Sequence, residues 1–111
     1  MSDILLVFCT FPSAESARQI GANLVQSQLA ACATLCPGAE SIYRWQGQIE
    51  NCTEVLAIIK TTRHMFSKLE AELAKAHPYD VPEILAVQAD CLSDAYRSWI
   101  IKSVGTDTED A

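Results

Sequence analysis

The candidate ligands for a soft metal ion are Cys9, Cys32 and His77, among the five cysteines and two histidines of this 111-residue sequence. Thiolate together with imidazole suits copper or zinc, and Cu(I) in particular. Free cysteine is also among the most frequently buried residue types, so each thiol taken alone is better explained by packing in a core. For His77, which precedes a proline, metal ligation and a hydrogen bond at the end of a helix both remain open.

Nucleophilic catalysis is the other chemistry open to Cys9 and His77, acting as nucleophile and base. The two histidines, His64 and His77, form no recognisable triad order with serine or cysteine. The segment 9–13, CTFPS, contains no arginine that could hold a phosphate group. We therefore expect that the protein is not an enzyme.

Charge and cysteine content restrict the partners and the compartment. The net charge is -6, and eight Lys and Arg residues are scattered singly, which argues against nucleic acid and anionic membranes as partners. No apolar run approaches the roughly 20 residues of a membrane span. Five cysteines without a CxxC pair are expected to be free thiols in a reducing compartment. Since the start of the sequence also lacks the pattern of a secretory signal, we expect a cytoplasmic protein.

A long β-hairpin over residues 33–61, turning at Gln46-Gly47, is the main structural feature that the sequence predicts. Its first strand would reach roughly 45 Å, two to three times an ordinary strand. Pro37-Gly38 predicts a bulge where the outer part leaves the sheet. This outer part carries Tyr43 and Trp45 on one face and Arg44 on the other. Because one domain of this size cannot cover it, we expect it to dock on a second copy of the chain, with sites between subunits.

The other elements alternate around this hairpin. A strand over 3–10, apolar enough to be buried on both faces, precedes a helix over 13–28. After the hairpin come a helix over 62–76 capped by Thr62, a strand over 84–89, and a last helix over 93–104 that presents Tyr96, Trp99 and Ile100 inward. The order β-α-β-β-α-β predicts an α+β, ferredoxin-like fold with an extra C-terminal helix. We expect one domain over 1–105 and a disordered acidic tail over 106–111.

Three segments together resemble the CutA family of divalent-cation tolerance proteins: LAACATLCPGAESIYRWQGQIE, IIKTT and HPYDVPEI. The resemblance covers nearly all of the chain and implies a homotrimer of ferredoxin-like subunits with a cleft at each subunit boundary. It attributes copper ligation to Cys9 and to two adjacent histidines before the Pro-Tyr pair, with Cys32 as a further thiol. Here the histidine pair reads Ala76-His77, so one of these ligands is absent.

Two functions follow from the resemblance. The first is a cytoplasmic, trimeric protein of divalent-cation response that binds copper or a similar cation weakly through Cys9, His77 and Cys32. The alternative is a sensor like the PII signalling proteins, in which Lys60 and Tyr79 hold a small anion or metabolite in the cleft between subunits. A purely structural trimer is a third possibility. In all three, Tyr43 and Trp45 are expected at the subunit interface.

Overall fold

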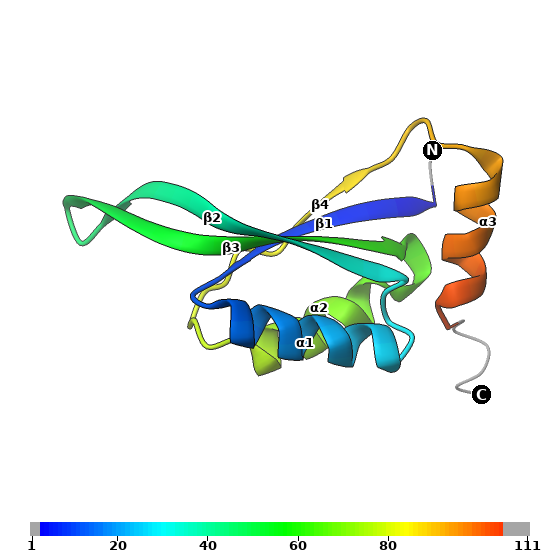
Figure 1. Cartoon of the computed structure of the whole chain (residues 1–111), viewed down its shortest axis with the longest axis horizontal. Helices are drawn as coiled ribbons and strands as arrows, with labels where there is room; N and C mark the ends of the chain where they lie inside the picture. The colour runs from blue at the N-terminus through cyan, green and yellow to red at the C-terminus, as the bar shows by residue number, and fades with distance from the viewer. Residues whose placement is uncertain (1–2, 106–111) are drawn as a thin grey trace.

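A four-stranded antiparallel sheet organises residues 3–105, the part of the chain that the computed structural model describes. The strands are β1 (Ile4–Phe11), β2 (Cys32–Trp45), β3 (Gln48–Thr62) and β4 (Leu85–Gln88). Their order across the sheet is β2-β3-β1-β4, so the most apolar strand, β1, is central as its sequence predicts (Figure 1). This order confirms the predicted ferredoxin-like α+β fold. The expected tail over 106–111 lies outside the described residues.

Two helices cover one face of the sheet and a third lies at its end (Figure 1). They are α1 (Ala14–Gln26), α2 (Phe66–Ala76) and α3 (Asp94–Ser103). Ser13 and Ser93 cap α1 and α3, because each hydroxyl oxygen accepts a hydrogen bond from a backbone N–H three residues on. The expected cap at Thr62 is wrong. A short 3₁₀ helix, η1 (Arg63–Met65), precedes α2, and the Thr62 side chain makes no capping hydrogen bond.

The core lies between the sheet and the helices α1 and α2. Alternate residues of β1, namely Val7, Cys9 and Phe11, face the helices together with Ala57 and Ile59 of β3, and all five are buried. The core is completed by side chains of the two helices, chiefly Ala17, Ile20, Leu24, Leu69 and Leu73. No helix among residues 3–105 is long and apolar enough to cross a membrane.

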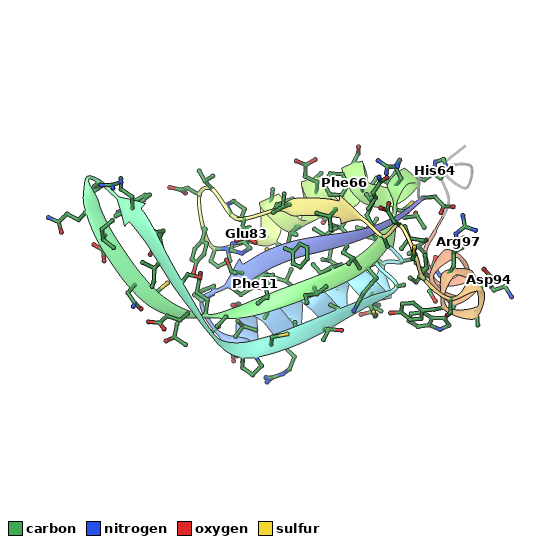
Figure 2. All side chains as sticks on the ribbon, turned by 90° about the horizontal axis from the view of Figure 1, so that it is seen from above. Phe11, His64, Phe66, Glu83, Asp94 and Arg97 are labelled. Atoms are coloured by element: carbon green, nitrogen blue, oxygen red, sulfur yellow. The ribbon has the colours of Figure 1, made fainter. Side chains whose placement is uncertain are left out.

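The opposite face of the sheet has no helix over its centre (Figure 2, seen from above the sheet). Leu6 and Phe8 of β1 are half-buried there, and Leu85 and Val87 of β4 beside them are exposed. The expectation that β1 is buried on both faces therefore holds only for the helical face within one subunit. We call this second surface the open face.

The hairpin of β2 and β3 extends past the rest of the subunit (Figure 1). The pairing register shifts between Cys36 and Ala39, as Pro37-Gly38 predicts, and Gly38 has a positive φ of 80°. The turn at Gln46 and Gly47 also uses positive φ angles, 50° and 80°. We call residues 39–54, beyond the register shift, the arm.

The last helix is oriented differently from the prediction. Ile100 is fully buried, but Tyr96 and Trp99 are exposed and stack on each other with ring centroids 5.6 Å apart. Tyr96 and Trp99 therefore form an aromatic pair on the surface and do not contribute to the core.

Candidate functional site

The candidate site lies where the end of β1 meets the loop that follows α2. The His77 ring is 7% exposed and stacks on Phe11, with ring centroids 4.7 Å apart. Its Nε2 lies 2.8 Å from the carbonyl oxygen of Thr10, which can only accept, so Nε2 carries the proton. Its Nδ1 accepts a hydrogen bond of 3.1 Å from the backbone N–H of Tyr79. The ring is therefore neutral and both of its nitrogens have partners.

The Cys9 thiol reaches the same carbonyl oxygen. Its Sγ lies 3.9 Å from the oxygen of Thr10, so Cys9 and His77 are neighbours in the fold. Cys9 is fully buried, and this burial, with smaller effects of Glu83 and Glu54, raises the pKa of the thiol to about 12. A thiol in such surroundings stays protonated at neutral pH, and only the thiolate is a good nucleophile or metal ligand.

Tyr79 links this cluster to the base of the arm. Its hydroxyl donates a hydrogen bond of 2.7 Å to Oε2 of Glu54, a carboxylate that is only 7% exposed. Burial and this hydrogen bond raise the pKa of the Tyr79 hydroxyl above its ordinary value of 10.0. Glu54 pairs with Ala39, the first residue of β2 after the register shift. Figure 2 shows Phe11 at the end of β1 and Glu83 in the nearby loop between α2 and β4.

Cys32 does not join Cys9 and His77. Cys9 pairs with Ala57 of β3, and Cys32 pairs with Lys60 of the same strand. Residues three apart on a strand point to opposite faces, so Cys9 faces the helices and Cys32 lies on the open face. There its Sγ is 3.7 Å from the hydroxyl of Tyr96. The predicted set of Cys9, His77 and Cys32 is therefore wrong as a single metal site within one subunit.

Lys60 and Tyr79 are also far apart. The Nζ of Lys60 donates a hydrogen bond of 3.0 Å to the hydroxyl of Thr34 on the open face. Tyr79 contacts Glu54, six residues along β3 from Lys60, which corresponds to roughly 20 Å. A ligand that touches both side chains would need residues from two subunits.

A copper site would need several ligand side chains close together. Among residues 3–105, no group of three or more His, Cys, Asp and Glu side chains could hold a metal ion. Cys9 and His77 both lie near the Thr10 carbonyl oxygen, but the Cys9 thiol is protonated and the His77 lone pair already accepts a backbone N–H. Ala76 supplies no ligand atom in place of a second histidine. The residues of one subunit therefore do not fit a copper site.

The comparison with known proteins identifies the family. A sequence model of the CutA1 divalent ion tolerance protein family matches residues 5–103. The chain belongs to this family. The divalent-cation tolerance protein CutA of Thermus thermophilus is 42% identical over 105 residues, which is 95% of this chain and 100% of that protein.

Solved CutA structures have the same fold. The crystal structure of CutA from Xylella fastidiosa matches with a TM-score of 0.91 at 42% identity, covering 94% of this chain and 100% of that one. A CutA from Archaeoglobus fulgidus matches with a TM-score of 0.89 at 31% identity, covering 92% and 99%, and its name calls it periplasmic. Because CutA names of this kind include a periplasmic protein, family membership leaves the compartment of this chain open.

The prediction from sequence missed Glu54 as a member of the site in this CutA chain. Glu54 and Lys60 are the only charged residues in the segment 52–62, and both occupy the even positions of β3 that point away from the helical core. A carboxylate at the edge of an apolar run needs a hydrogen-bond donor, and Tyr79 provides it. The sequence shows a charged residue in a largely apolar strand, but it does not identify Tyr79 as the donor.

Proposed function

We propose that this CutA-family chain acts in divalent-cation tolerance as a cytoplasmic homotrimer, that it binds copper or a similar cation weakly, and that it is not an enzyme. The observation that carries the proposal is the match to CutA over residues 5–103, combined with an arm whose apolar side chains have no cover in the subunit. The relatives compared above are named as tolerance proteins and not as enzymes. Five free cysteines are compatible with a reducing compartment.

Exposed apolar side chains on the arm support assembly. Trp45 is 61% exposed, and Tyr43 lies on the same face of the ribbon. Ile42 and Ile49, 67% and 63% exposed, lie on the other face with Arg44. Together with Leu85 and Val87 on the open face, these exposed apolar side chains favour contact with another chain. A homotrimer that buries the arms and open faces accounts for them.

The state of the candidate ligands limits the affinity that any cation can reach. A cation at His77 would have to displace the Tyr79 N–H, and a cation at Cys9 would have to deprotonate a thiol buried in the core. The remaining cysteines, Cys32, Cys36, Cys52 and Cys91, are half-buried or exposed, and among residues 3–105 none of them joins a group of three or more ligand side chains. Single thiols hold copper less firmly than a closed set of ligands.

Two measurements test this proposal. Sedimentation equilibrium at micromolar concentration should give three chains per particle, and a stable monomer would refute the assembly. Calorimetric titration of the reduced protein with Cu(I) and Cu(II) should detect weak binding. An affinity as high as that of structural metal sites, or complete absence of heat, would refute the weak-binding part.

A small-ligand sensor remains the second candidate because Lys60 places an ammonium group on the largely apolar open face. In a trimer this group could face Tyr79 of a neighbouring subunit, which would bring the two together as they are not in one chain. A thermal-shift screen with small anions and metabolites tests it, since a ligand that binds only the folded state raises the melting temperature. No shift with any anion at millimolar concentration would remove this candidate.

A further inference from the structure

His77 occupies the position of a copper ligand in the CutA resemblance, yet its contacts are those of a structural residue. A neutral imidazole has one lone pair available for a metal, and in His77 that lone pair accepts the N–H of Tyr79 at 3.1 Å. The other nitrogen donates to the carbonyl oxygen of Thr10 at 2.8 Å, and one ring face is covered by Phe11. A cation at Nδ1 would leave the Tyr79 N–H without its acceptor.

These contacts continue to the base of the arm. Tyr79 is held in place by His77 through its backbone, and its ring lies 4.8 Å from the imidazole, centroid to centroid. Its hydroxyl then reaches the buried carboxylate of Glu54, opposite Ala39 where the arm begins. A continuous chain of hydrogen bonds therefore runs from the end of β1 through the loop to β3.

We propose that Cys9 and His77 are not cation ligands in this chain, and that Thr10, His77, Tyr79 and Glu54 form a structural network that fastens the loop 77–84 and fixes the base of the arm. Cys9 packs beneath this network as a core thiol. Ala76 is consistent with this assignment, because no hydrogen bond of the network requires a histidine at position 76.

The ligand half of the proposal is tested on the reduced, full-length protein with Cu(I) delivered in competition with a chromogenic chelator. His77→Asn removes both ring nitrogens but offers an acceptor near the Nδ1 position, and Cys9→Ala removes the buried thiol. His64→Asn is the matched control, because it makes the same substitution at an exposed histidine outside the network. We expect the first two variants to bind Cu(I) within twofold of the parent. A loss of tenfold or more in either one, with the control unchanged, would overturn the proposal.

A second readout does not depend on any variant. Long-range ¹H–¹⁵N correlation spectra of the unsubstituted protein should show His77 as the Nε2–H tautomer. These resonances should stay in place when one equivalent of Zn²⁺ per chain is added. A shift of the His77 ring nitrogens on zinc addition would refute the inference.

The network half is tested by amide hydrogen exchange. His77→Ala should speed exchange at least tenfold in the loop 77–84 and at the first pairs of the arm, while His77→Asn, which keeps an acceptor for Tyr79, should restore much of the protection. Equal acceleration over the whole sheet in both variants would show general destabilisation and refute the network. If the parent binds no cation at all, weak binding fails as a function, whereas the exclusion of Cys9 and His77 as ligands is supported.

Discussion

Replacing Tyr79 by phenylalanine removes one hydroxyl group and leaves the ring and the backbone contact to His77 unchanged. The lost hydroxyl donates a hydrogen bond of 2.7 Å to the carboxylate of Glu54, a residue that is only 7% exposed. Hydrogen bonds to charged groups contribute about 1.5–3 kcal/mol. Because Tyr79 itself is half-buried, water can reach part of the vacated position. We therefore expect the free energy of unfolding to fall by about 1.5 kcal/mol.

The assay is urea unfolding at one fixed protein concentration, since assembly makes apparent stability depend on concentration. Tyr96→Phe is the matched control, because the same group is removed from an exposed tyrosine whose partner is a thiol at 3.7 Å. We expect the control to change the free energy of unfolding by less than about 0.5 kcal/mol.

A double-mutant cycle separates this hydrogen bond from other effects. Tyr79→Phe and Glu54→Gln should be coupled by about 1 kcal/mol or more, because each substitution weakens the same contact. Free energies that add to within about 0.3 kcal/mol would refute the role of this contact. A loss in the Tyr96→Phe control equal to that in Tyr79→Phe would refute it as well.

Three further predictions concern other parts of the molecule. Trp45→Ser should weaken subunit association by about 2 kcal/mol or more, measured by sedimentation, while the circular dichroism of the subunit is unchanged; an unaltered association constant would contradict the interface. Gly38→Ala should cost about 1 kcal/mol in urea unfolding, because φ is 80° there and no atom within 4 Å would obstruct the added carbon. The hydrogen bond from Arg97 lowers the pKa of Asp3 below 3.8, so this contact stabilises the fold above about pH 4 and is lost as the pH falls through the lowered value. NMR titration of the Asp3 carboxyl should show the lowered pKa, and Arg97→Gln should raise this pKa toward its ordinary value.

Local signals in the sequence predicted the hairpin and the main elements. Pro37-Gly38 cannot continue a regular ladder, and the structure has its register shift there. Gln46-Gly47 is the turn, and Ser13 and Ser93 are the helix caps. These features depend on residues within one turn of each other, so sequence alone contains them.

The orientation of α3 and the state of the site could not be predicted in the same way. Tyr96 and Trp99 have the spacing of a buried helix face, but an aromatic residue suits an interface as well as a core. The sequence indicates that Cys9 and His77 are chemically able to bind a metal. It does not indicate that the Thr10 carbonyl and the Tyr79 N–H occupy the imidazole, because those backbone positions are set by tertiary structure.

The two apolar faces of the arm have a consequence for how this protein is made. A newly folded chain exposes apolar side chains on both faces of the arm, with Ile42 and Ile49 on one face and Tyr43 and Trp45 on the other. An exposed ribbon of this kind can pair with the strand edge of another chain and so promote aggregation. In the proposed homotrimer the arms would therefore have to pair soon after folding, and slow expression should yield more soluble protein than rapid overproduction.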